Sequence, residues 1–290
     1  MKHVVSKACE PFGVAQGKLT VHQIPACQDN FIWIVQCNET GDAAVIDGPE
    51  AEPALAYCKH HNIRLTAVLN THTHWDHVGI NRQLDKLGYL KNLRVYGCGE
   101  RADEIPGLSH PVDEGDVILI GNVPAQVWRT EGHLDGHLSY VFDGALFCGD
   151  TMFGAGCGYL FDGPPAKMQA SLERFKQLPK DTLVCCAHEY TQDNLRFAWS
   201  IEPDNQHLAM RIDETWLRRK RGWATVPSTI ELECLTNPFL RWDSSTIHRN
   251  VLSPGSLSHD PVSIFAAMRC LKDTKAYKTI SDAKLPLKKS

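Results

Sequence analysis

Four side chains that commonly bind metal ions occur within six residues of this chain, directly after an apolar run. The run LTAVL has the composition of a buried strand, and His72, His74, Asp76 and His77 follow it. In an extended segment alternate side chains point the same way, so the first two histidines are expected to share one face. The chain is then expected to turn at Gly79 into a helix. A solvated, histidine-rich turn is the alternative, but this pattern at the end of a buried strand favours a metal site.

Three further candidate ligands follow apolar runs elsewhere in the chain. His133 comes after AQVWRT, Asp150 ends ALFCGD, and His188 comes after TLVCCA. A buried histidine is often satisfied by hydrogen bonds alone, whereas a buried carboxylate is costly without a cation or donors. The first two histidines of the cluster can bind one ion, and Asp76 and His77 can bind a neighbouring one. Because four residues cannot complete the coordination of two ions, we expect these three residues to join the cluster.

Strand-like runs with few helices between them fill the first two-thirds of the chain, which predicts two sheets covered by helices. Strands are expected at 19–24, 31–36, 43–47, 65–71, 93–97, 116–121, 125–130, 138–144, 145–150 and 182–187. Helices are expected at 52–62, 167–179, 192–201, 205–222 and 260–278. Because the spacing becomes helical after about residue 190, we expect a domain boundary between residues 188 and 189.

Charge and cysteine content bear on the partners and the compartment. The net charge of −4 argues against a nucleic-acid partner, and the basic run RRKR (218–221) is interpreted as the solvated face of a helix. No run predicts a membrane span or a secretory signal. The eleven cysteines are irregularly spaced and include no C-x-x-C, which indicates buried, reduced thiols and predicts a cytoplasmic protein.

Five motifs occur in an order that resembles a known enzyme family. THTHWDH, GHLDGH, FCGDTMF, GCGYLFDG and CCAHEYT resemble glyoxalase II, the hydroxyacylglutathione hydrolases of the metallo-β-lactamase superfamily, and the likeness extends from about residue 24 to about 275. The resemblance implies an αββα sandwich as a catalytic domain over 1–188, with no role assigned to an extension at 1–20. It implies a mainly helical substrate-binding domain over 189–290. The implied activity is hydrolysis of S-(2-hydroxyacyl)glutathione thioesters, such as S-D-lactoylglutathione, to glutathione and a 2-hydroxy acid such as D-lactate. This would be the second step of methylglyoxal removal.

The same resemblance implies two divalent metal ions and seven ligands. One ion would be held by His72, His74 and His133, and the other by Asp76, His77 and His188, with Asp150 bridging the two. Zinc is expected, with iron and manganese as alternatives, because histidine and carboxylate ligands suit all three metals. His137 is interpreted as structural, and the remaining histidines, including His60 and His61, as surface residues.

This ligand set explains a hydrolase that has no side-chain nucleophile. Two divalent cations, the two carboxylates of Asp76 and Asp150, and a bridging hydroxide sum to about +1, which can stabilise a developing oxyanion. The metal-bound hydroxide would be the nucleophile, with Asp76 as the catalytic carboxylate beside it. The sequence contains no G-x-S-x-G elbow, and Cys157 is interpreted as packed among glycines. A thiol leaving group with a pKa near about 8.5 departs without strong acid assistance, so a thioester suits this site better than an amide.

Substrate-binding residues are also implied by the resemblance. They are Tyr159, Leu160, Phe161, Tyr190, Asn194, Arg269 and Lys272. Arg269 and Lys272 are spaced i, i+3 on an expected helix and could clamp carboxylates, although a pair of exposed helix charges is the alternative. Tyr159 stands where some members of the family have a cation. Asp47 precedes Gly-Pro in place of the usual Pro-Gly, and we expect it to support the metal ligands.

Other functions are weighed against the same residues. A persulfide dioxygenase with one iron would not need His77 and His188 as ligands. A β-lactamase would commonly have cysteine where this chain has Asp150, and a structural zinc site would be rich in thiolates. A catalytically silent binder of glutathione conjugates is the alternative from another class, and the seven intact ligands argue against it. We expect a monomer that acts on a small molecule, with no nucleic-acid or membrane partner.

Overall fold

The computed structural model describes residues 5–252 and 260–288, in which two sheets face each other. Residues 1–4 of the predicted extension, and 253–259 and 289–290 of the predicted second domain, lie outside the described residues. The strands are β1 (Phe12–Val14), β2 (Leu19–Ala26), β3 (Asn30–Cys37), β4 (Asp42–Ile46), β5 (Arg64–Leu69), β6 (Arg94–Cys98), β7 (His110–Val112), β8 (Val117–Ile120), β9 (Val123–Arg129), β10 (Leu138–Phe142), β11 (Ala145–Gly149), β12 (Met152–Phe153), β13 (Gly156–Cys157), β14 (Leu183–Cys186) and β15 (Ser228–Thr229). The α-helices are α1 (Glu52–His61), α2 (Trp75–Lys86), α3 (Pro165–Lys176), α4 (Thr191–Ile201), α5 (Gln206–Lys220), α6 (Ile230–Thr236), α7 (Ser245–Val251) and α8 (Pro261–Asp273).

The first sheet has the order β1-β2-β3-β4-β5-β6-β7, and the second has the order β15-β14-β11-β10-β9-β8. The first sheet begins with antiparallel strands and becomes parallel from β4 onward, with α1 and α2 as connections. In the second sheet β11 and β14 are parallel and are joined through α3. All ten predicted strands and all five predicted helices are confirmed.

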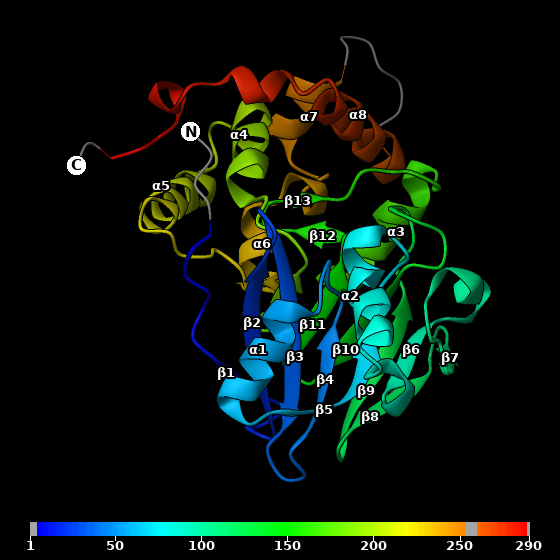
Figure 1. Cartoon of the computed structure of the whole chain (residues 1–290). Coiled ribbons are helices and arrows are strands. Elements are labelled where there is room, and N and C mark those ends of the chain that lie inside the picture. Colours follow the sequence, from blue (N-terminus) through cyan, green and yellow to red (C-terminus); the bar gives the residue numbers. More distant parts are fainter. Residues whose placement is uncertain (1–4, 253–259, 289–290) are drawn as a thin grey trace.

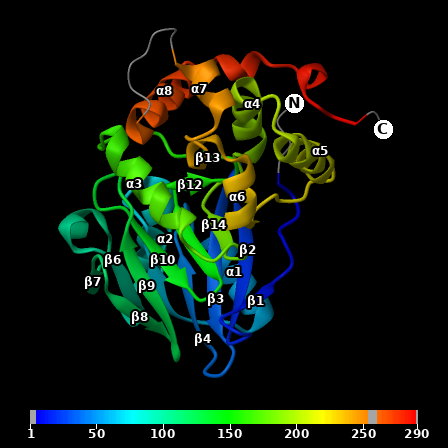
Figure 2. The same ribbon diagram turned by 180° about the vertical axis from the view of Figure 1, so that it is seen from behind.

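Alternation along the strands explains the layers. In β3, Phe31, Trp33 and Val35 belong to the core between the sheets, whereas Ile32 and Ile34 face α1 and α2 in a second core. Helices α1 and α2 cover one outer face (Figure 1), and α3 lies on the other side (Figure 2). This is the expected αββα sandwich.

The C-terminal region forms a group of helices at one end of the sandwich, coloured yellow to red in Figure 1. It also contributes β15, which pairs antiparallel with β14 and so extends the second sheet. The interpretation of RRKR as a solvated helix face is wrong for Arg219. This side chain is buried against the segment that follows α5, where its Nη1 donates to the carbonyl of Trp223. Among the described helices, none combines the length and apolar character needed to cross a bilayer.

Candidate metal centre

The seven predicted ligands come from segments that follow the carboxyl ends of strands. The segments are the loop after β5 with His72 and His74, the first turn of α2 with Asp76 and His77, the loop after β9 with His133, the end of β11 with Asp150, and the end of β14 with His188. Strands β9, β11 and β14 run in the same direction, so their carboxyl ends meet at one edge of the second sheet. An antiparallel bridge between Asn30 and His188 joins that edge to the first sheet.

The expectation that the chain turns into a helix at Gly79 is wrong. Helix α2 begins at Trp75, so Asp76 and His77 already lie in its first turn. Gly79 is inside the helix, where a Cβ atom would lie only 2.2 Å from the carbonyl oxygen of Pro49. The glycine is therefore required by close packing of α2 against the segment after β4, and a sequence pattern cannot distinguish this use from a turn.

The ligand atoms form two groups, within each of which all atoms lie within 4.8 Å of one another. The first group is His72, His74, His133 and Asp150, and the second is Asp76, His77 and His188. Nδ1 of His74 lies 3.1 Å from Nε2 of His72 and 3.0 Å from Nε2 of His133. Asp150 spans both groups, because its Oδ2 lies 3.5 Å from Nε2 of His133 while its Oδ1 lies 3.4 Å from Nε2 of His77 and of His188.

Hydrogen bonds on the far side of the rings determine which nitrogen faces the centre. Nδ1 of His133 donates to the carbonyl of Tyr159 at 2.8 Å, and Nδ1 of His77 donates to Oδ2 of Asp47 at 2.9 Å. Each of these rings therefore carries its proton on Nδ1 and presents the lone pair of Nε2 to the centre.

Two more rings are oriented in the same way. Nδ1 of His188 lies 3.2 Å from Oδ1 of Asp29. Nδ1 of His72 lies 3.1 Å from the hydroxyl of Thr71, which itself donates to Asp47 at 2.6 Å and so is free to accept from the ring. Four of the five imidazoles thus direct Nε2 inward, where a metal ion can take the place of a proton.

The donor set fits a cation. Within the described residues, Nε2 of His77 and Oδ1 of Asp150 are buried without a hydrogen-bond partner, although they face each other at 3.4 Å. With the proton of His77 on Nδ1, two lone pairs oppose each other in a buried site, which is unfavourable unless a positive charge lies between them. Imidazole and carboxylate ligands are the set that zinc, iron and manganese accept.

The carboxylates and imidazoles also shift one another's ionisation. Burial disfavours the charged carboxylate of Asp76, but a hydrogen bond from His188 and the charge of His77 lower its pKa to about 2. Burial likewise disfavours the charged form of His188, yet Asp150, Asp29 and Asp76 raise its pKa to about 9. The carboxylates therefore favour positive charge around His188, whereas burial lowers the pKa values of His72, His74 and His133 in the first group.

Asp47 and His137 support the ligands without belonging to either group. Asp47 is buried, and besides His77 it accepts the backbone N–H of Thr71 at 2.8 Å. His137 is also buried, accepts the backbone N–H of Asp150 at 3.2 Å, and stacks on His72 with ring centroids 4.8 Å apart. These contacts agree with the supporting roles expected for both residues.

The expectation that the remaining histidines lie on the surface holds for His60 and His61 and is wrong for His22. The side chain of His22 is covered by α1, and its Nδ1 lies 3.0 Å from the hydroxyl of Tyr57. A histidine on a strand face beneath a helix is buried by tertiary packing, which no local motif reports.

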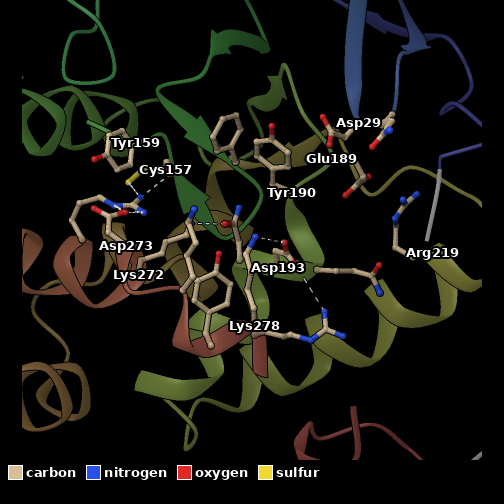
Figure 3. A pocket seen from close by; sticks show the side chains of 18 of the residues that line it. Asp29, Cys157, Tyr159, Glu189, Tyr190, Asp193, Arg219, Lys272, Asp273 and Lys278 are labelled. Carbon is tan, nitrogen blue, oxygen red and sulfur yellow. Dashed lines mark hydrogen bonds and ion pairs between the residues drawn. The ribbon is translucent and has the colours of Figure 1, made fainter. Parts of the chain in front are cut away.

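A cavity of about 1090 Å³ adjoins the metal centre and is walled by the C-terminal helices (Figure 3). Six of the seven predicted substrate-binding residues line it, namely Tyr159, Phe161, Tyr190, Asn194, Arg269 and Lys272. The seventh, Leu160, is not among the lining residues and packs against the core between the sheets. The rings of Tyr159 and Phe161 contact each other with centroids 4.9 Å apart at the cavity, and the side chain of Leu160 between them packs into the core instead.

Arg269 and Lys272 are buried, with 7% and 6% of their surfaces exposed, so the alternative of two exposed helix charges is wrong. Lys272 donates to Oδ1 of Asn194, and burial together with the charge of Arg269 lowers the pKa of Lys272 to about 7. Tyr190 stacks on His188 with ring centroids 4.7 Å apart, which joins the cavity wall to the metal centre.

Asp29 is a residue of the site that the sequence analysis missed. It lies in the turn between β2 and β3, lines the cavity, and approaches His188 with its carboxylate. An acidic residue in a tight turn at the carboxyl edge of a strand was the available signal. It carried little weight because aspartate is common in turns for purely local reasons.

Comparisons with known proteins cover both parts of the chain. A family model described as the metallo-beta-lactamase superfamily matches residues 26–188, and one described as the hydroxyacylglutathione hydrolase C-terminus matches residues 189–275. A hydroxyacylglutathione hydrolase of Synechococcus sp. is 44% identical over 258 residues, which cover 86% of this chain and 97% of that protein.

Two solved structures share the fold. A metallo-beta-lactamase from Staphylococcus aureus superposes with a TM-score of 0.59 at 21% identity, covering 87% of this chain and 71% of that one. TTHA1623, solved in a di-iron-bound form, superposes with a TM-score of 0.51 at 26% identity, covering 76% of this chain and 98% of that one.

Proposed function

The chain belongs to the hydroxyacylglutathione hydrolase family, and from this premise we propose how its side chains hydrolyse the thioester of S-(2-hydroxyacyl)glutathione. It is a metal-dependent thioester hydrolase, whose products are glutathione and a 2-hydroxy acid such as D-lactate. One observation carries the mechanism: Asp150 spans two groups of ligands whose imidazole lone pairs converge on a buried centre.

We propose that His72, His74, His133 and Asp150 hold one divalent ion and that Asp76, His77, His188 and Asp150 hold a second. Bound ions of this kind supply Lewis acidity and a water that ionises near neutral pH. Zinc is the proposed metal, and iron stays an alternative because TTHA1623, which shares the fold, was solved in a di-iron-bound form.

The remaining chemistry belongs to the side chains of the chain itself. The carboxylate of Asp76 is ionised at neutral pH, and Asn30 donates to its Oδ2 at 3.2 Å, so this oxygen is held in place to accept a hydrogen bond from the attacking water. Tyr190 and Phe153 pack against His188 and shield that side of the centre from bulk water. Exclusion of water strengthens the electrostatic stabilisation of the developing oxyanion.

We propose that the cavity holds the glutathione part of the substrate. Glutathione carries two carboxylates and one ammonium group, and the cavity wall offers both signs of charge. Lys272 lines the cavity, and so do Asp193 and Lys278, whose carboxylate and ammonium groups lie 3.6 Å apart. The thiol product has a pKa near about 8.5, so it departs without a dedicated acid.

A single-iron persulfide dioxygenase explains the site less well. That chemistry would leave Asp76, His77 and His188 as a complete second ligand group without a use. The intact ligand set and the adjoining cavity likewise disfavour a silent binder.

We further propose that residues 1–188 form the catalytic domain and 189–290 the substrate-binding domain, and that the enzyme acts as a monomer in the cytoplasm. All seven proposed ligands lie within residues 1–188, whereas most of the residues that line the cavity come after residue 188. All eleven cysteines are free thiols, which suits a reducing compartment.

The test is hydrolysis of S-D-lactoylglutathione by purified protein, with metal content measured on the same sample. We expect two divalent ions per chain, loss of turnover on chelation and recovery when metal is returned. His74→Ala should remove turnover and leave a folded chain, while the exposed His60→Ala should match the wild type. Full turnover by the metal-free protein would contradict the proposal, and so would one iron per chain with oxygen consumption on glutathione persulfide.

A further inference from the structure

The hairpin formed by β12 and β13, with the two residues that follow it (152–159), is held by side chains of the C-terminal region. Each of four side chains binds a backbone atom of this hairpin segment. Asn194 donates to the carbonyl of Gly154 at 2.9 Å, and Asn237 donates to the carbonyl of Gly156 at 3.0 Å. Glu233 accepts the N–H of Ala155 at 2.8 Å. Arg269 donates to the carbonyls of Cys157 and Gly158 at 3.2 and 3.3 Å. These donors and acceptors come from α4, from α6 and the residue after it, and from α8. Three helices of the C-terminal region therefore contribute to holding the hairpin segment.

The far end of the hairpin segment touches the metal centre. The carbonyl of Tyr159 accepts the Nδ1 proton of His133, which directs the Nε2 lone pair of that ring inward. At Gly158 a Cβ atom would lie 2.1 Å from the carbonyl oxygen of Asp150 and 2.9 Å from Nδ1 of His133. The segment is therefore packed directly against two proposed ligands, and a shift of its backbone moves the acceptor that orients one of them.

Arg269 is the side chain that holds the segment next to this point. Its Nη1 binds the carbonyls of Cys157 and Gly158, while its Nε and Nη2 bind Oδ1 of Asp273 at 3.0 and 2.6 Å. Figure 3 shows Asp273 and Cys157 together at this end of the cavity. Only 7% of the surface of Arg269 is exposed, and its guanidinium is bound by the hairpin carbonyls on one side and by Asp273 on the other.

We propose that Arg269 is a positioning residue for the metal ligand His133, acting through the carbonyls of residues 157–159. Helix α8 thereby links the substrate cavity to the metal centre. The proposal rests on the proposed metal site, but it assigns Arg269 a role beyond contact with substrate. Residues that orient metal ligands typically contribute about 10- to 100-fold to metal affinity or activity.

Lys272 provides a matched control for Arg269. It lies one turn further along α8, lines the same cavity and is equally buried. It is positively charged at pH 6, but its Nζ binds the side chain of Asn194 and no backbone carbonyl of the hairpin segment is bonded to it. At pH 6 a loss that follows from charge alone would therefore appear in both variants, whereas a loss that follows from the carbonyl bonds would appear only at Arg269.

The experiment measures the affinity of the metal-free protein for zinc by competition with a chromophoric chelator, alongside kcat and KM. For Arg269→Met we expect one of the two zinc equivalents to bind about 10- to 100-fold more weakly and kcat to fall with it. Arg269→Gln, which keeps one amide donor, should recover part of the affinity. Lys272→Met should raise KM and leave zinc affinity unchanged.

Three outcomes separate the hypotheses. Wild-type zinc affinity in Arg269→Met, with only KM raised, would make Arg269 a substrate contact and overturn the proposal. An equal loss of zinc affinity in Lys272→Met would attribute the effect to charge and would overturn it as well. A wild-type chain that binds no metal would instead contradict the proposed function. Circular dichroism of the metal-free variants checks folding, and if Arg269→Met does not fold, Arg269→Gln decides by the same readout.

Discussion

Replacing Asp47 by asparagine is expected to move the proton of the His77 ring from Nδ1 to Nε2. The carboxylate of Asp47 accepts three hydrogen bonds, from Nδ1 of His77 and from the backbone N–H and hydroxyl of Thr71. An asparagine can keep the backbone bond through its oxygen, but its amide N–H₂ then faces Nδ1 of His77. That arrangement is favourable only when Nδ1 gives up its proton, which places an N–H on Nε2, toward Asp150.

The magnitude follows from the bond that is lost. If His77 keeps its inward lone pair, two N–H groups oppose each other, and a hydrogen bond to a charged acceptor worth about 1.5 to 3 kcal/mol disappears. At about 1.4 kcal/mol per factor of ten, the metal affinity of the group with Asp76, His77 and His188 should fall by about 10- to 150-fold. Removing the carboxylate also removes one negative charge next to the centre, and this acts in the same direction.

The assay combines zinc affinity with kcat/KM for S-D-lactoylglutathione in Asp47→Asn. Asp42→Asn is the control, because Asp42 begins β4, the strand that Asp47 follows, and its carboxylate pairs only with the exposed Arg64 among the ion pairs of the described residues. This control should change stability by less than about 1 kcal/mol and leave turnover unchanged. If Asp47→Asn stays within twofold of the wild type in both readouts, the reasoning about the tautomer is refuted.

Three further predictions concern the cavity, the hairpin and the core. Because the pKa of Lys272 is lowered to about 7, its charge is present below pH 7 and lost above it, so KM for the anionic substrate should rise by up to about tenfold between pH 6 and 8. Lys272→Arg should abolish that pH dependence, and a slope that persists in this variant would exclude Lys272 as its source. Gly158→Ala should lower kcat and destabilise by about 1 to 3 kcal/mol because its Cβ meets the carbonyl of Asp150, while Gly13→Ala, with ordinary contacts, should be tolerated in the same kinetic and unfolding measurements. Phe265→Ala should lower the free energy of unfolding in urea by about 3 to 5 kcal/mol because this ring is fully buried in α8 against Phe239, and a loss below about 1 kcal/mol would contradict that packing.

Much of the fold follows from short-range patterns that act within single elements. The ten predicted strands were apolar runs of the length that a sandwich requires, and the amphipathic spacing predicted helices such as α1, α4 and α5. Patterns of this kind report burial on average and fail for individual residues. Arg219 and His22 were expected at the surface and are buried, because a neighbouring segment in one case and a helix in the other covers them.

In the candidate site, too, local patterns predicted some residues and missed others. The ligands follow strand ends, and strand ends can be read locally, so His72, Asp150 and His188 could be proposed from the sequence. Their partners could not be read in this way. The turn with Asp29 is 159 residues from His188, and the hairpin carbonyls bound by Arg269 are more than 110 residues from it.

By itself, the sequence determined the chemical inventory of this protein: which residues can bind a metal, and at which strand ends they lie. Only the tertiary structure decided how each ligand ring is oriented and which side chains hold it there. The physical reason is the sequence separation of the interacting residues. Hydrophobic periodicity and turn preference act over only a few residues. The hydrogen bonds that choose a tautomer join atoms brought together only when the two sheets and the C-terminal helices have packed.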